Sequence, residues 1–172
     1  MKVSEVIELS AVLLDIELTD EVKNDLLKCY NLVEQELATD YFPILEVDKF
    51  FNVDDKIYFK DFSRKVYFIK GVQDFRGDKV DYQINPEYIE IKKNYDGGTF
   101  FVKYYYIPAE KGLYSTCTYG AEYISILKYG IAAEYTLVNA KLCDTAALYK
   151  ASEFTSKYKE RIKLKGPKKK CK

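Results

Sequence analysis

The sequence predicts an α+β protein in which a block of strands is inserted into a helical bundle. Apolar residues recur at helical spacing over the first forty residues and again over residues 115–163. Between these two segments, residues 41–114 hold nine of the ten phenylalanines and ten of the seventeen tyrosines, in short runs. Because the strands are grouped and do not alternate with helices, this order argues against a parallel α/β sheet.

Two helices are expected in residues 1–40. Ser4 is placed to cap the first helix, and Thr19, followed by two acids, is placed to cap the second. The apolar stripe of the second helix comprises Val22, Leu26, Tyr30, Val33 and Leu37, and the side opposite it carries Lys23, Asp25, Glu34 and Gln35. This spacing predicts a packed amphipathic helix that ends near Asp40.

Residues 41–114 are expected to form an antiparallel β-domain of five or six strands. Runs such as KVYFIKGV and TFFVKYYYI are rich in aromatic and β-branched residues, and the turn sequences FRGD, NPE and DGG separate such runs. The glycine pair at 97–98 is typical of a hairpin turn. Successive side chains of a strand point to opposite faces, so Tyr104–Tyr106 must expose at least one ring.

Two more helices are expected in residues 115–163. The first, over Tyr119–Leu142, is apolar around most of its circumference, so it must be covered from more than one direction. It is either the central helix of a monomeric bundle or a helix that contacts another subunit. Asp144 is the expected cap of the last helix, and Glu153 and Lys157 are spaced to form an ion pair on its exposed side.

The composition excludes several classes of chemistry. The chain has no histidine, and its four cysteines (Cys29, Cys117, Cys143 and Cys171) are not paired in sequence, so we expect neither a metal site nor a His-dependent nucleophile. The first three cysteines are interpreted as buried helical residues and the last as an exposed thiol. No phosphate-binding glycine loop occurs, and no cofactor is expected. Carboxylates such as Asp54 and Asp55 leave a carboxylate enzyme as an alternative, although acids at that position more often form a turn.

No apolar stretch approaches the ~20 residues that cross a bilayer, and the first residues lack the pattern of a signal peptide, so no membrane association is expected. The charge is unevenly distributed along the chain. Residues 1–55 carry fourteen acids against four lysines, a net charge of −10, and residues 157–172 carry a net charge of +8. Residues 164–172 are therefore predicted to form a basic C-terminal arm.

The residues expected to bind a partner through this arm are Arg161, Lys163, Lys165, Lys168, Lys169, Lys170 and Lys172. One interpretation is that the arm docks on an acidic protein surface, with RIKLK added as a strand to a sheet edge. A DNA-binding accessory protein is a second interpretation, because lysines neutralise phosphates. A tail that only improves solubility is the third.

The segment ILKYGIAAEYTLVNAKLCDTAALYKASEFTSKYKERIK resembles the C-terminal helical segment of the head-to-tail adaptor (connector) proteins of tailed bacteriophages. The family pattern is a Tyr-Gly-small-Ala-Glu-Tyr helix, matched by Tyr129–Tyr135. A short break and an Ala-rich helix with a late Lys-Tyr-Lys follow, matched by Ala146–Lys159. Over residues 1–114 the likeness is architectural: a helical bundle interrupted by a β insertion is similar to the adaptors of short-tailed phages, including crAss-like ones.

The resemblance implies a structural virion protein and not an enzyme, made in the cytoplasm of a bacterial host and located at the neck between capsid and tail. Such adaptors form a ring of about twelve copies under the portal protein, by a head-to-tail contact that closes on itself. The tail or nozzle protein binds the opposite surface, and genomic DNA passes through the lumen. Another neck component, such as a tail-completion or stopper protein, stays open as an alternative. The expected subunit-interface residues are Tyr123, Gly130, Ala133, Tyr135, Leu137, Phe154 and Tyr158.

Overall fold

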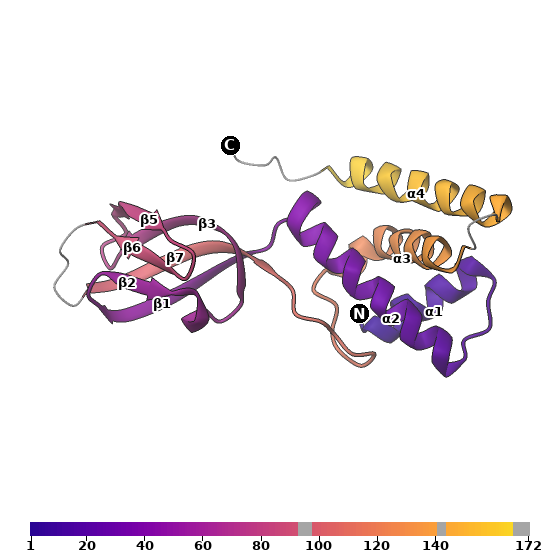
Figure 1. The fold of residues 1–172 in the computed structure, drawn as a ribbon, viewed down its shortest axis with the longest axis horizontal. Coiled ribbons are helices and arrows are strands. Elements are labelled where there is room, and N and C mark those ends of the chain that lie inside the picture. Colours follow the sequence, from indigo (N-terminus) through magenta and orange to yellow (C-terminus); the bar gives the residue numbers. More distant parts are fainter. Residues whose placement is uncertain (93–97, 141–143, 167–172) are drawn as a thin grey trace. The chain divides into compact units, whose positions relative to one another are not determined.

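The computed structural model describes residues 1–92, 98–140 and 144–166, and the chain forms two compact units (Figure 1). The helical unit combines Met1–Phe42 with Glu110–Lys172, and the β unit is Pro43–Ala109. The sequence-based boundaries of the inserted domain were 41 and 114. The order of helices, antiparallel strands and helices is confirmed, so the protein belongs to the α+β class.

The helical unit is built around α3. Its elements are α1 (Val3–Leu14), α2 (Asp20–Glu36), α3 (Ile124–Asn139) and α4 (Thr145–Lys165). A π-helical turn, Leu37–Tyr41, extends α2, and a 3-10 turn, Ala121–Tyr123, leads into α3. Helix α3 packs against α1, α2 and α4, which explains why it is apolar on several sides. The structure therefore shows α3 as the central helix of a bundle within one chain.

Two of the three predicted helix caps are confirmed. The Thr19 side chain accepts a hydrogen bond from the backbone N–H of Val22, and the Asp144 side chain accepts one from Ala147. The prediction for Ser4 is wrong, because α1 already begins at Val3. The backbone N–H of Lys2 instead donates to the Glu5 carboxylate at 3.1 Å.

The apolar stripe of α2 is buried as predicted at Leu26, Tyr30, Val33 and Leu37, but Glu34 was wrongly assigned to the exposed side. Glu34 is only 1% exposed. Its carboxylate accepts hydrogen bonds from the Tyr30 hydroxyl at 2.5 Å and from the backbone N–H of Thr118 at 2.8 Å. The segment before α3 thus covers this side of α2 and supplies a backbone donor to the buried acid.

The β unit contains two antiparallel sheets. One has the order β1-β7-β3-β4 and the other β2-β6-β5. The strands are β1 (Leu45–Val53), β2 (Lys56–Tyr58), β3 (Lys65–Asp74), β4 (Lys79–Val80), β5 (Tyr82–Ile84), β6 (Tyr88–Ile91) and β7 (Gly98–Ile107). The described part of the unit therefore has seven strands and not five or six, because the sequence runs did not mark β1 and did not separate the short strands β4 and β5.

The turns of the β unit follow the sequence signals in two of three cases. FRGD joins β3 to β4, where the Asp74 carboxylate accepts from the backbone N–H groups of Arg76 and Asp78 at 2.9 Å each. NPE joins the paired strands β5 and β6. The hairpin predicted at 97–98 is wrong, because β6 and β7 belong to different sheets. Residues 93–97, which include most of that turn, lie outside the described residues.

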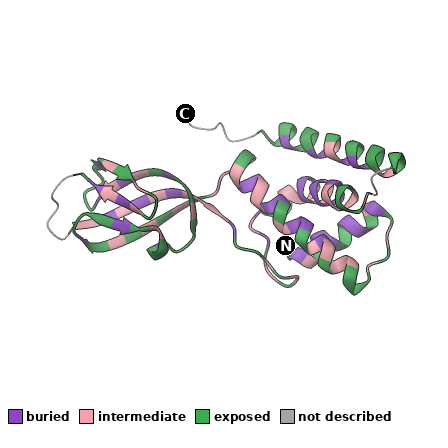
Figure 2. Cartoon of the chain, in the orientation of Figure 1, coloured by how far each residue is buried: buried purple, intermediate pink, exposed green. Residues whose placement is uncertain are grey.

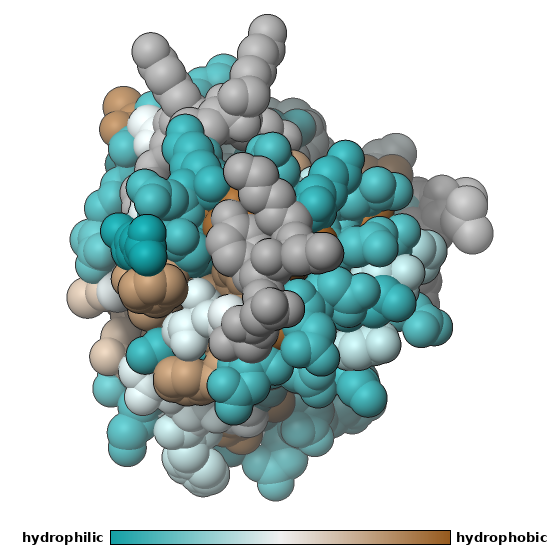
Figure 3. Space-filling model, turned by 90° about the vertical axis from the view of Figure 1, so that its left-hand side faces the viewer, coloured by the Kyte–Doolittle hydropathy of each residue, from teal (hydrophilic) through white to brown (hydrophobic). Residues whose placement is uncertain are grey.

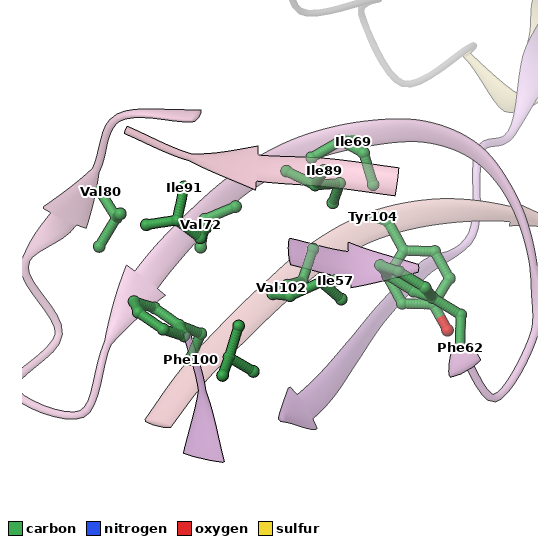
Figure 4. Close-up of a cluster of buried hydrophobic side chains, with 11 residues drawn as sticks. Ile57, Phe62, Ile69, Val72, Val80, Ile89, Ile91, Phe100, Val102 and Tyr104 are labelled. Atoms are coloured by element: carbon green, nitrogen blue, oxygen red, sulfur yellow. The ribbon is translucent and has the colours of Figure 1, made fainter. Parts of the chain in front are cut away.

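The two sheets enclose a hydrophobic core of their own, shown in Figure 4. Its members come from six of the seven strands and from Phe62; Ile89, Phe100 and Val102 are fully buried. Tyr104 also points inward, and its hydroxyl donates to Asp48 at 2.8 Å. Its neighbour Tyr105 lies on the opposite face of β7, but Tyr105 and Tyr106 are both half-buried, so the prediction that the run exposes a ring is met only in part.

Candidate interaction surfaces

The carboxylates of the described residues include exposed and buried groups. Asp54 and Asp55 are exposed in the turn between β1 and β2. The buried carboxylates, Glu34 and Asp74, are bonded to groups of their own chain. In the parts of the chain that the structure describes, no group of three or more His, Cys, Asp or Glu residues could hold a metal ion.

The cysteines are placed partly as predicted. Cys29 is buried in α2, and burial raises the pKa of its thiol to about 11. Cys117 is buried in the irregular segment before α3 and not on a helix as expected, and burial also raises the pKa of its thiol. Both thiols thus stay protonated near neutral pH, which makes them poor nucleophiles. Cys143 and Cys171 lie outside the described residues.

Helix α4 is fixed to the bundle along one stripe and exposed along the other. Ala151, Phe154, Tyr158 and Ile162 are buried, as Figure 2 shows by the purple positions on α4. The Tyr158 hydroxyl donates to the Glu36 carboxylate of α2 at 3.1 Å. Burial raises the pKa of both groups, and the Glu36 charge raises that of Tyr158 further. The predicted ion pair between Glu153 and Lys157 is present at 2.5 Å on the outer side.

Most residues predicted for the subunit interface are used inside the chain. Gly130, Ala133, Phe154 and Tyr158 are buried in the packing of the helical unit, so another subunit could reach them only if α4 moved away. This result corrects the prediction for these four residues. Its physical reason is that small residues on α3 allow close packing of α2 and α4 of the same chain.

The other three predicted interface residues keep accessible surface. Leu137 is 55% exposed at the end of α3. Tyr123 and Tyr135 are half-buried. Beside Leu137, exposed hydrophobic side chains of α3 and α4 include Val138, Leu148, Tyr149 and Leu164. The pair α3 and α4 therefore exposes apolar side chains that the other described residues do not cover.

The basic arm begins later than predicted. Arg161, Lys163 and Lys165 belong to α4, so RIKLK is helical and the prediction that it adds to a sheet as a strand is wrong. The Lys165 ammonium lies 4.5 Å from the centre of the Tyr123 ring, and the Arg161 guanidinium lies 6.0 Å from that of Tyr129. Lys163 is exposed. The predicted contacts at Lys168, Lys169, Lys170 and Lys172 lie outside the described residues.

The outer face of the four-stranded sheet carries lysines and aromatic rings, and we refer to it as the lysine–aromatic face. The strand register aligns Val47 of β1 with Lys103 of β7 and Gly71 of β3. Two residues further along β7, it aligns Leu45, Tyr105 and Phe68 in the same way. Residues opposite each other in a sheet share a face. The members of this face are Leu45, Val47, Lys49, Phe51, Phe68, Lys70, Gln73, Lys79, Phe101, Lys103 and Tyr105.

A hollow of about 350 Å³ opens in this face at Gly71. The register shifts between Ile69 and Gly71, so Lys70 is an extra residue and its side chain turns over the Tyr105 ring at 5.7 Å. Gly71 itself has no atom within 4 Å of the position a Cβ would take. The hollow is lined by Lys70, Gln73, Lys79 and Lys103, together with one carboxylate, that of Asp81.

A second unpartnered surface runs along α1. Glu5, Glu8, Leu9 and Val12 are spaced three or four residues apart, share one face of the helix and are exposed, Val12 by 78%. Asp15 continues this face at the end of the helix. We call these five residues the acidic stripe. It combines three carboxylates with two apolar side chains.

Sequence reasoning missed both of these surfaces. The lysines of the β unit are isolated among aromatic residues, so no charge run marks them, and only the strand register brings them to one face. Their alternation with buried residues along β1 and β7 was the signal available. Figure 3 views the molecule from the side of the β unit, and there the hydrophobic residues form small separate groups among hydrophilic ones.

The sequence matches no known protein family and no curated protein. Among the helices of the described residues, none is long and apolar enough to cross a membrane.

Proposed function

We propose that this protein is a structural component of a tailed bacteriophage, a subunit of the head-to-tail adaptor ring that docks on the portal protein. The family in this proposal comes from the resemblance of Tyr129–Tyr135 and Ala146–Lys159 to the C-terminal helices of phage adaptor proteins. The observation that carries it is the architecture: a four-helix unit, with α3 at its centre, receives a separately cored β unit as an insertion.

The surfaces of the protein support a role in assembly. The apolar side chains Leu137, Val138, Leu148 and Tyr149 are exposed on α3 and α4, and an isolated soluble subunit gains nothing from exposing them. The lysine–aromatic face and the acidic stripe are also accessible, and their charges are mainly of opposite sign. Surfaces of this kind are what a ring subunit presents to its neighbours and to the proteins above and below it.

In this proposal the basic C-terminal residues contact the portal. Those of them that the structure describes are helical, so they would meet the portal as part of a helix and not as a strand. Residues 161–165 reach the partner as the last turn of α4, with Ile162 buried against the bundle. Residues 167–172 continue from Gly166. The portal, the tail or nozzle protein and further copies of the chain are the partners, and DNA passes through the lumen of the ring.

The test is the mass of the purified protein by light scattering, alone and mixed with the portal protein of the same virus. We expect a ring of about twelve copies, alone or on the portal. Deletion of residues 167–172 should abolish portal binding without unfolding the protein, because the cut leaves α4 complete. Replacement of Lys168, Lys169, Lys170 and Lys172 by glutamine is the matched control for chain length. A protein that stays monomeric with and without portal would overturn the proposal.

The same variants distinguish the adaptor from a DNA-binding accessory protein. A DNA-binding accessory protein would bind duplex DNA with steep salt dependence and lose that binding in both the deletion and the glutamine variant. An adaptor would lose portal binding instead.

A further inference from the structure

The lysine–aromatic face and the acidic stripe carry mainly opposite charges. On the sheet, Lys103 lies next to the exposed Val47 of β1, and Lys79 of β4 lines the hollow on the other side of β3. On α1, Glu5, Glu8 and Asp15 flank the exposed Leu9 and Val12. Each surface thus combines apolar side chains with charges that are mainly or wholly of one sign, since the hollow holds a single acid, Asp81.

Six charged residues of the two surfaces take part in none of the ion pairs of the described residues. The ion pairs found there join Lys23 to Asp20, Lys28 to Asp25 and Lys157 to Glu153. None of them involves the three carboxylates of the acidic stripe, nor Lys49, Lys79 or Lys103 of the sheet. Complementary unpaired charges orient two surfaces toward each other and exclude wrong partners.

We propose that the lysine–aromatic face of one copy of this chain receives the acidic stripe of α1 from a second copy. This inference rests on the proposed function, because it assigns the contact between neighbouring subunits of the ring. The two surfaces belong to different units of the chain and differ from each other, so the contact is head-to-tail and propagates from copy to copy until a ring closes.

The arrangement of the aromatic rings favours a helix over a single-stranded nucleic acid as the occupant. The Lys49 ammonium covers Phe51 and Phe101, at 4.5 and 5.3 Å from the ring centres. The Phe68 ring is stacked with that of Tyr105 at 6.4 Å. These contacts occupy only part of the rings, and Phe51 and Phe68 remain 62% and 53% exposed. Single strands are bound by bases that stack on free ring faces, and the lysines over Phe51, Phe101 and Tyr105 leave fewer such faces. The ammonium groups and aliphatic side chains left at the surface suit carboxylates and apolar residues of a helix.

The hollow at Gly71 gives the contact a defined position. A side chain from the second copy could enter it between Lys79 and Lys103, because glycine leaves the space open. We expect one of the carboxylates of the acidic stripe to occupy it, since the lysines around the hollow outnumber its single acid, Asp81. Gly71→Leu would fill the hollow and weaken the contact without changing any charge.

The experiment uses two charge-reversed sets in the full-length chain. The stripe set is Glu5→Lys, Glu8→Lys and Asp15→Lys, and the sheet set is Lys49→Glu, Lys79→Glu and Lys103→Glu. Mass is measured by light scattering under the conditions, alone or on the portal, in which the unmodified protein forms its ring. Each set alone should weaken association at least about tenfold, since it places like charges together. A thermal unfolding transition like that of the unmodified protein shows that each set is folded.

Mixing provides the decisive observation. The stripe set carries lysines on both surfaces and the sheet set carries acids on both, so each should bind only the other and an equimolar mixture should recover the oligomer. A chain that combines both sets should also associate. Glu87→Lys with Lys92→Glu, two exposed residues of the β unit, is the control that moves charges elsewhere and should leave the mass unchanged.

The outcomes separate this inference from the proposed function. If the unmodified protein forms a ring and neither charge-reversed set changes its mass, the inference is overturned and the adaptor proposal stands. If the unmodified protein is monomeric alone and with portal, both fail. A third outcome combines three observations: the unmodified protein binds a single-stranded oligonucleotide, the sheet set loses that binding, and the stripe set leaves the mass unchanged. In that case the face binds nucleic acid and the inference is overturned.

Discussion

Gly130 of α3 lies directly against the ring of Tyr158 of α4. A Cβ atom built on Gly130 would lie 3.0 Å from Cε2 of Tyr158 and 2.8 Å from Cγ1 of Val33 on α2. Distances of this size are shorter than packed carbon atoms tolerate, which is about 3.5 to 4.0 Å. The absence of a side chain at Gly130 thus lets α2, α3 and α4 meet at one point. Gly130 is the glycine of the segment Tyr129–Tyr135.

Gly130→Ala should therefore destabilise the helical unit. Overpacking of a buried site costs about 1 to 3 kcal/mol, and the gain in helix propensity of about 1 kcal/mol offsets only part of it. We expect the free energy of unfolding in urea to fall by up to about 2 kcal/mol. Gly112→Ala is the control, because nothing lies within 4 Å of its Cβ position. Equal stability of the two variants would show that α4 is loosely held.

The buried carboxylate of Glu34 gives a second prediction. Glu34→Ala leaves the Tyr30 hydroxyl and the Thr118 N–H without their acceptor. An unsatisfied buried group costs about 1 to 3 kcal/mol, so we expect a loss of about 2 to 4 kcal/mol in the free energy of unfolding. Glu34→Gln keeps a carbonyl oxygen as acceptor and should lose about half as much. Chemical denaturation followed by circular dichroism measures both, with Glu17→Ala as the exposed control, expected to stay within about 0.5 kcal/mol.

The sequence was a good guide to the fold where one local signal decides the outcome. The caps at Thr19 and Asp144, the turn at Asp74 and the buried stripe of α2 depend on residues a few positions apart. It failed where distant segments decide. Glu34 reads as a surface acid until the segment at Thr118 covers it, and β6 and β7 read as a hairpin although they pair in different sheets.

The same limit applies to the interaction surfaces. Gly130, Ala133, Phe154 and Tyr158 have the composition of a helix contact, but composition does not say whether the partner helix belongs to the same chain. Conversely, Lys103 and Lys79 are far apart in sequence and meet only through the pairing of β3 with its neighbours on both sides.

Tyr104 makes the β unit sensitive to alkali. Burial, together with the charge of the Asp48 carboxylate that accepts its hydrogen bond, raises the pKa of this phenol to about 12. An unfolded tyrosine has a pKa of about 10. Because the folded value is the higher one, the stabilisation is fully present below about pH 10 and is lost as the pH rises through about 12.

The measurement compares the unmodified protein with Tyr104→Phe by urea denaturation at increasing pH. Below about pH 10 the variant should be less stable by about 1 kcal/mol, because its hydrogen bonds to Asp48 and Ser63 are lost. This difference should shrink as the pH approaches 12. Tyr58→Phe, which changes a more exposed ring, should show no such trend. A constant difference for Tyr104→Phe would contradict the role assigned to its ionisation.

The β unit should be removable as a whole. It enters and leaves through neighbouring strands: Leu45 of β1 pairs with Tyr105 of β7, and the backbone N–H of Tyr106 donates to the carbonyl oxygen of Ile44. Its ends therefore lie close together, and its core consists of its own residues. Replacing residues 43–109 by a short Gly/Ser linker should leave the helical unit folded, since α3 keeps its contacts with α1, α2 and α4. Helical circular dichroism with a cooperative thermal transition checks this.

In the assembly assay the same protein should fail to form the ring even though it is folded, because it lacks the lysine–aromatic face. An intact ring without the β unit would place the subunit contact entirely in the helices.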